Sequence, residues 1–314
     1  MTPALPVVAV VGPTAVGKSD LSLALAETLG GEVVNTDSMQ LYRGMDIGTA
    51  KLSVAERRGI PHHLLDVLDV SEPATVAEFQ GWARSAIADC RARGVVPVLV
   101  GGSALYTRAV LDRFEFPGTD PAVRSRYEEQ LAEVGPQALH ARLAEVDPEA
   151  AGRILPLNGR RIVRALEVIE LTGRPFSASL PALEYVDPAT VQIGIDCPRA
   201  VLDERIEQRV RRMWDAGFVD EVRALAERGL REGRTASRAL GYQQVLAHLS
   251  GEMTEVEALE ATVNGTRRFA RKQDAWFRKD PRIHWVDWDD PGVVESAVAV
   301  VLSRPAGGPT APRS

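Results

Sequence analysis

Short apolar runs alternate with segments of helical periodicity over the first hundred residues. Apolar runs at 6–11, 32–36 and 95–100 are each followed by glycine or aspartate, and apolar residues within 74–93 recur on one face of a helix. This alternation is typical of parallel β-α-β units. The pattern therefore predicts an α/β fold, to which the run at 191–196 adds a fourth strand after a long helical interval.

Turn residues divide the rest of the chain. Prolines and glycines between about 117 and 186 separate amphipathic helices, which indicates a helical domain inserted into the α/β core. The predicted organisation is a first part of the core at 1–116, a helical insertion at 117–186, and the completion of the core with C-terminal helices at 187–303. Residues 304–314, rich in proline, glycine and serine, are expected to form a disordered tail.

Composition narrows the class of protein. A chain of 314 residues with 45% apolar residues can bury a sizeable core, and no stretch approaches the roughly 20 apolar residues of a membrane span. Cys90 and Cys197 form no C-x-x-C pair, which favours a reducing compartment, so we expect a cytoplasmic protein with no membrane contact. The net charge of −6 argues against a protein that coats nucleic acid, but it leaves room for a local basic groove.

A phosphate-binding motif follows the first apolar run and precedes a helix-like segment at 20–29. It has the pattern G-x-x-x-x-G-K-S/T and comprises Gly12, Pro13, Thr14, Ala15, Val16, Gly17, Lys18 and Ser19. Its backbone N–H groups and the helix N-terminus attract phosphate, the lysine reaches the outer phosphate, and the serine hydroxyl can ligate Mg²⁺. The motif predicts a P-loop NTPase-like core, but kinases, ATPases and some transferases share it.

Polar residues after two other strands are candidates for chemistry. Asp37 follows the second apolar run, and Gly101-Gly102-Ser103 follows the third, so both should face the phosphate loop at the carboxyl end of a parallel sheet. The strand before Asp37 is expected to lie next to the strand before the phosphate loop, which would place Asp37 near Lys18. Asp37 could act as a general base, could hold Mg²⁺ through water, or could cap a turn.

Basic residues gather near the C-terminus. Between 266 and 282 seven residues are basic and two are acidic, an excess that fits either RNA backbone contact or a solvated helix face. Phe269 and Trp276 in this segment are expected in the core rather than as base-stacking residues. Arg160 and Arg164 could contact RNA or could decorate a helix, with Glu167 pairing Arg164.

Taken in order, these segments resemble the bacterial tRNA dimethylallyltransferase family. The resemblance rests on the phosphate loop, 37–42, 44–51, 101–106, 158–168, 204–209, 241–242 and 266–277. It implies transfer of a dimethylallyl group from dimethylallyl diphosphate to N6 of the adenosine just 3′ of the anticodon of tRNA, with Mg²⁺ as cofactor. The chain departs from the family at Arg160, where glutamine is common, and at Gln243, where a basic residue is common.

The resemblance also assigns site residues. Catalytic roles fall to Asp37 as the base, to Ser19 as the Mg²⁺ ligand and to Arg209, which clamps the diphosphate opposite Lys18. The anticodon stem-loop of the tRNA is expected to contact Asp37, Ser38, Met39, Gln40, Ser103, Arg124, Arg160, Arg161, Arg164, Arg238, Gly241, Tyr242, Gln243, Arg271 and Lys272. The insertion at 117–186 is then a tRNA-facing domain, and the protein is expected to act as a monomer.

Two other functions remain open on the residues alone. One is a small-molecule or nucleotide kinase that uses ATP in the same loop. The other is an RNA-binding regulator in which a nucleotide switches conformation. Arg209 and the basic C-terminal helix argue for the transferase, because a small-molecule kinase has no evident need for them.

Overall fold

The computed structural model describes residues 5–114, 116–176 and 183–303. All neighbouring strands of its six-stranded sheet run parallel, in the order β3-β2-β4-β1-β5-β6, so the predicted α/β fold is confirmed. The strands are β1 (Val7–Val11), β2 (Gly31–Asn35), β3 (His62–His63), β4 (Val96–Gly101), β5 (Thr190–Asp196) and β6 (Ile283–Asp287). The expected disordered tail at 304–314 lies outside the described residues.

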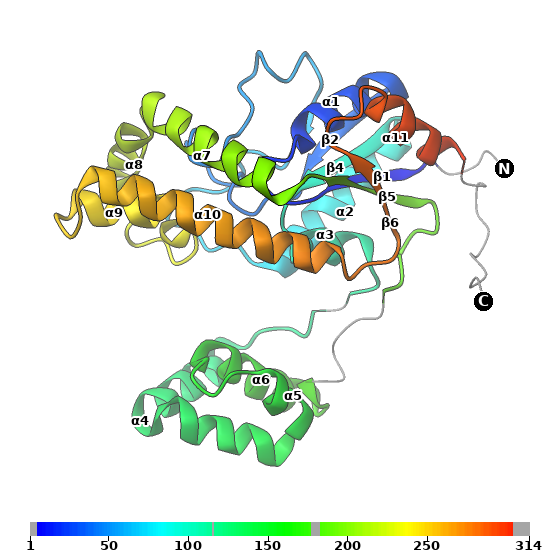
Figure 1. Cartoon of the computed structure of the whole chain (residues 1–314). Coiled ribbons are helices and arrows are strands. Elements are labelled where there is room, and N and C mark those ends of the chain that lie inside the picture. The colour runs from blue at the N-terminus through cyan, green and yellow to red at the C-terminus, as the bar shows by residue number, and fades with distance from the viewer. Residues whose placement is uncertain (1–4, 115, 177–182, 304–314) are drawn as a thin grey trace. The chain divides into compact units, whose positions relative to one another are not determined.

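Helices cover both faces of the sheet (Figure 1). Alternate side chains of β1 enter two separate apolar clusters, one with Val7 and Val11 and the other with Val8 and Val10. The first cluster is closed by helices α2 (Val76–Ala92) and α3 (Ala104–Leu111), and the second by α1 (Lys18–Leu29) and α11 (Val293–Leu302). Burial on both faces explains why the central strands are continuous apolar runs.

Four further helices follow β5 in the chain and pack against one another (Figure 1). They are α7 (Arg199–Asp215), α8 (Phe218–Glu227), α9 (Tyr242–Leu249) and α10 (Glu255–Phe277). Helix α10 begins at a capping box in which Thr254 and Glu257 each bond the other's backbone N–H. It packs against α7 and α9, so its buried stripe includes Ala270, Gln273 and Phe277.

The expectation that Phe269 and Trp276 lie in the core is wrong. Their side chains are 47% and 51% exposed. Each precedes a buried residue of α10 by one position, which is a rotation of about 100° around the helix, away from the buried stripe. Seven-residue spacing alone could not tell which face of the helix is buried.

The chain divides into two compact units. One comprises Met1–Leu111 with Tyr185–Ser314, and the other comprises Asp112–Glu184. The second unit contains α4 (Pro121–Val146), α5 (Pro148–Arg153) and α6 (Gly159–Thr172) around a core of its own. Helix α4 is interrupted at Gly135, where φ is 80°, because Pro136 cannot continue the hydrogen-bond ladder. No helix among the described residues is long and apolar enough to cross a membrane.

Candidate active site

The phosphate loop connects β1 to α1 and lines a cleft of about 610 Å³. Three of its residues have positive φ, namely Gly12 at 139°, Ala15 at 65° and Gly17 at 110°. Positive-φ residues within such a loop help turn backbone N–H groups toward one concavity. The loop therefore presents amide donors and the N-terminus of α1 to the cleft, as an anion requires.

Lys18 lines this cleft. Its Nζ donates a hydrogen bond to the backbone oxygen of Pro13 at 2.7 Å. Burial, and next the positive charge of Arg209, lower the pKa of Lys18 to about 7, although the negative charge of Asp37 acts in the opposite direction. The ammonium is therefore held in a place where an anion would relieve both the desolvation and the repulsion from Arg209.

Anion binding should thus be coupled to proton uptake. Above pH 7 Lys18 is largely neutral in the free protein, and a bound diphosphate should raise its pKa, so binding at pH 8 should take up about one proton at this residue and weaken as the pH rises further. Calorimetry with inorganic pyrophosphate in buffers of different ionisation enthalpy measures the number of protons taken up on binding. The Lys18→Met variant is the control that isolates protons taken up by pyrophosphate itself, and equal uptake by both proteins would contradict the coupling.

Three arginines of α7 face the phosphate loop. Arg205, Arg209 and Arg212 recur at positions i, i+4 and i+7, and all three line the cleft. Arg205 Nε donates to the backbone oxygen of Ala15 at 2.9 Å, and Arg209 Nη1 lies 3.5 Å from Thr14 Oγ1. Sequence reasoning identified Arg209 alone, although the helical spacing of the other two was visible in the sequence.

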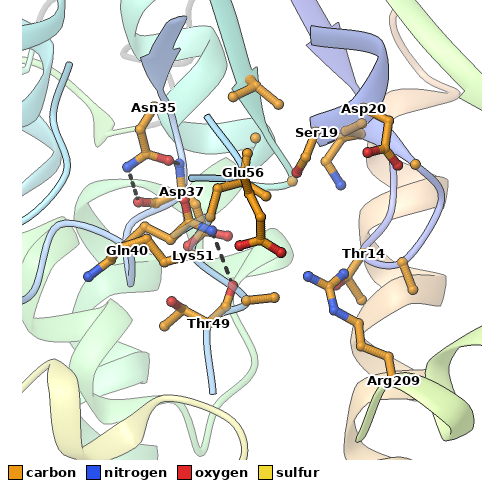
Figure 2. Close-up of a pocket in the computed structure, with 18 of the residues that line it drawn as sticks. Thr14, Ser19, Asp20, Asn35, Asp37, Gln40, Thr49, Lys51, Glu56 and Arg209 are labelled. Atoms are coloured by element: carbon orange, nitrogen blue, oxygen red, sulfur yellow. Dashed lines mark hydrogen bonds between the residues drawn. The ribbon is translucent and has the colours of Figure 1, made fainter. Parts of the chain in front are cut away.

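Asp37 enters the cleft from the side opposite Ser19, Thr14 and Arg209 (Figure 2). The buried Asn35 fixes its backbone, because Asn35 Oδ1 accepts from Asp37 N at 2.8 Å and Asn35 Nδ2 donates to Asp37 O at 2.9 Å. Asp37 Oδ1 accepts from Met39 N at 2.9 Å, so one carboxylate oxygen does cap the turn. Within the described chain no hydrogen bond occupies Oδ2, and the carboxylate can still accept a proton.

The same cleft has the chemistry of a magnesium site. The hydroxyl of Ser19 and the carboxylate of Asp37 both line it. Mg²⁺ prefers hard oxygen ligands and usually binds through one or two protein groups together with phosphate oxygens and water. The residues present therefore fit the cation when a diphosphate supplies the remaining ligands.

A second cavity of about 540 Å³ adjoins the cleft, and Thr14, Asp37, Thr49 and Arg209 line both. Its walls are more apolar and include Val210, Met213, Phe218, Leu240 and Phe269. Of the expected tRNA-contacting residues, those that line it are Asp37, Ser38, Met39, Ser103, Arg238, Gly241, Tyr242, Gln243 and Lys272, whereas Gln40 lines the first cleft. Arg271 is exposed on α10 beside Lys272 and lines neither.

Glu221 of α8 organises one wall of the second cavity. Its carboxylate accepts hydrogen bonds from the backbone N–H groups of Asp46, Ile47 and Gly48, at 3.0, 2.6 and 3.2 Å. The fully buried Tyr242 donates its hydroxyl to the same carboxylate at 2.6 Å, so this hydroxyl is already engaged. Sequence reasoning missed Glu221, because the three backbone N–H groups that it accepts from are about 175 residues away along the chain.

The expected arginines of the insertion unit differ in their contacts. The buried Glu167 accepts from Arg124 Nη2 at 2.7 Å and from Arg164 Nη1 at 2.9 Å, so the pairing of Arg164 with Glu167 is present. Arg160 and Arg161 are exposed and form no ion pair among the described residues. These two side chains are therefore the ones left available to an external anion.

The fold is that of a P-loop α/β protein in which a cleft suited to an anion adjoins a second, more apolar cavity. A family model described as IPP transferase matches residues 40–280, and the chain belongs to this family. The tRNA dimethylallyltransferase of a Nocardioides species is 68% identical over 298 residues, covering 95% of this chain and 96% of that protein. That of Thermobifida fusca is 64% identical over 303 residues and covers 95% of each chain.

Solved structures agree with this family. The crystal structure of the tRNA isopentenylpyrophosphate transferase from Bacillus halodurans matches with a TM-score of 0.69 and 40% identity, covering 95% of this chain and 94% of that one. A eukaryotic dimethylallyltransferase acting on tRNA matches with a TM-score of 0.82 and 27% identity, covering 98% of this chain and 82% of that one.

Proposed function

We propose that this protein transfers a dimethylallyl group from dimethylallyl diphosphate to N6 of the adenosine just 3′ of the anticodon of tRNA, releasing diphosphate. The observation that carries this proposal is the junction of the two cavities. An anion cleft lined by Lys18 and Arg209 adjoins a more apolar cavity, and Asp37 lines both. The relatives from Nocardioides and Thermobifida fusca match nearly the whole chain, and both are named tRNA dimethylallyltransferase.

The residues at the junction have separate roles in the proposed reaction. The N6 lone pair attacks C1 of the dimethylallyl group, the C1–O bond breaks, and its electron pair leaves with the diphosphate. Asp37 accepts the proton that N6 loses, because an exocyclic amine is a poor nucleophile unless a base is in place. Lys18, Arg209 and the loop amides stabilise the charge that develops on the leaving diphosphate. Mg²⁺, held through Ser19, would share this charge when bound.

The second cavity suits a base removed from the anticodon stack. An adenine within a stacked loop cannot reach Asp37, so it must be flipped out to react. The cavity offers apolar walls at Phe218 and Met213 and polar groups at Ser103 and Gln243. Such a mixture stacks a base and hydrogen-bonds its edges.

The tRNA backbone is proposed to contact exposed basic residues. Arg268, Arg271 and Lys272 of α10 are exposed and form no ion pair in the described part of the chain. By contrast, Arg267 pairs with Glu207, and Arg278 pairs with Asp196 and Asp274. We assign the anticodon stem to α10 and to Arg160 and Arg161 of the insertion. Both cavities are built within one unit of one chain, so we propose that the protein acts as a monomer.

One assay tests this function. Incubation with unmodified tRNA and dimethylallyl diphosphate, followed by mass analysis of the nucleosides, should show one adenosine heavier by a dimethylallyl group in place of hydrogen. ATP turnover without RNA, together with no nucleoside change, would instead support the kinase.

The contribution of α10 is measurable as a salt dependence. Two cations on one helix can neutralise phosphates but do not by themselves read bases, so Arg271→Ala with Lys272→Ala should weaken all tRNAs similarly. The slope of log affinity against log salt should shrink by about 0.9 for each phosphate that is no longer neutralised, taking the duplex value. Arg223→Ala is the control, because Arg223 pairs with Asp220 on α8 and lines neither cavity. An unchanged slope in the double variant would mean that Arg271 and Lys272 contact no phosphate and are only solvent-exposed side chains.

A further inference from the structure

Gln273 connects α10 to the phosphate loop. Its side chain is buried, at 7% exposure, although the two residues before it are exposed. Oε1 accepts from the backbone N–H of Thr14 at 2.9 Å, and Nε2 donates to the backbone oxygen of Gly102 at 2.7 Å. An N–H can only donate and a carbonyl can only accept, so these two partners fix the orientation of the amide.

The surrounding backbone is shaped to this side chain. A Cβ at Gly102 would lie 2.4 Å from Gln273 Nε2 and 3.4 Å from the backbone oxygen of Gly12. Only glycine therefore fits at position 102 while Gln273 keeps its place. The phosphate loop, the loop after β4 and α10 meet at this one carboxamide, so Gln273 is not a residue that merely faces solvent.

The hydrogen bond to Gln273 removes a donor from the phosphate loop. Pro13 has no N–H, and the N–H of Thr14 already bonds Gln273, so anion binding is left to the amides from Ala15 to Ser19. An anion longer by one phosphate needs additional donors, and an unpaired charged oxygen in a cleft is costly. The side-chain hydroxyl of Thr14 also lies 3.5 Å from Arg209 Nη1, so the hydrogen bond to Gln273 holds in place a residue that contacts Arg209.

We propose that Gln273 is a positioning residue that sets the length of the anion, so that the cleft accepts a diphosphate and disfavours a triphosphate. This inference rests on the proposed function, because the anion is the diphosphate of the prenyl donor. It assigns the selectivity to a hydrogen bond from a helix far along the chain rather than to the phosphate-loop motif itself.

Calorimetry with inorganic pyrophosphate and inorganic tripolyphosphate tests the proposal. The wild-type protein should bind pyrophosphate more tightly. In Gln273→Met, which keeps the volume but loses both hydrogen bonds, the ratio of the two affinities should fall by about tenfold, as expected when one amide is freed for a charged oxygen. Gln273→Glu keeps an acceptor for Thr14 N–H, so it should weaken both anions by charge repulsion while retaining the preference for pyrophosphate.

The control is Asn264→Ala, which removes a carboxamide from an exposed position of the same helix and should change neither affinity. Equal weakening of both anions in Gln273→Met, an unchanged ratio, or a wild-type protein that prefers tripolyphosphate would each overturn the proposal. Failure of the proposed function is a separate result, because it shows in the wild-type nucleoside assay whatever the anion ratios are.

Discussion

Replacing Arg209 by alanine should lower kcat/KM for dimethylallyl diphosphate by about 10²- to 10³-fold. Removing one preorganised group that stabilises developing negative charge typically costs this much. Arg209 lines both the anion cleft and the adjoining cavity and lies against Thr14 of the phosphate loop. Arg205 and Arg212 line the anion cleft alone, so neither occupies the position of Arg209 between the two cavities. Steady-state kinetics with saturating tRNA measure the loss.

Two further variants identify the cause. Arg209→Lys keeps the charge but loses the planar fork that matches phosphate oxygens, so its activity should lie between those of wild type and the alanine variant. Arg211→Ala removes a neighbouring arginine of α7 that pairs with Glu207 and lines neither cavity, and it should leave kcat/KM unchanged. A folded Arg209→Ala protein within about threefold of wild type would remove Arg209 from the site.

The same variant has a second readout. The charge of Arg209 is one cause of the lowered pKa of Lys18, so its removal should raise that pKa from about 7 toward its ordinary value. Burial, the larger cause, remains, so a larger fraction of Lys18, but not all of it, would be protonated at pH 8, and pyrophosphate binding there should take up less than the proton expected for wild type. Unchanged proton uptake would show that burial alone lowers the pKa.

The apolar runs predicted the central strands, because burial on both faces leaves little room for polar residues. β3 and β6 were not predicted for different reasons. β3 has only two residues, and β6 carries exposed and half-buried side chains at four of its five positions, so neither forms an apolar run. The pattern of apolar runs also does not predict the order of the strands in the sheet. We expected the strand before Asp37 to lie next to the strand before the phosphate loop, but β4 separates β2 from β1.

That error did not displace the site. All neighbouring strands are parallel, so their carboxyl ends share one edge whatever their order, and Asp37 and Lys18 line the same cleft. Motifs predict residues whose function is set by local backbone, as in the phosphate loop. Gln273 acts through hydrogen bonds that form only after folding, because its partners Thr14 and Gly102 are 259 and 171 residues away. No spacing in the sequence encodes such a contact.

Asp37→Asn should lower kcat by about 10²- to 10⁴-fold, which is about 3 to 5 kcal/mol of barrier, because it removes the base that takes the proton from N6. Asparagine keeps an oxygen for the N–H of Met39, so the turn and its bonds to Asn35 should persist and the affinity for tRNA should change little. Single-turnover kinetics with prebound tRNA and dimethylallyl diphosphate measure the chemical step.

The dependence on Mg²⁺ separates the two active roles of Asp37. If the carboxylate acts as the base, added Mg²⁺ should not restore the rate of Asp37→Asn, because the amide still cannot accept the proton. If it acts mainly through the cation, diphosphate affinity should fall together with the rate, and higher Mg²⁺ should recover part of both. Asp37→Ala supplies the matched comparison, since it loses the oxygen that caps Met39 as well as the charge. A folded Asp37→Asn protein with near-normal kcat at neutral pH would leave Asp37 as a turn cap, because asparagine keeps the oxygen that accepts from Met39 N.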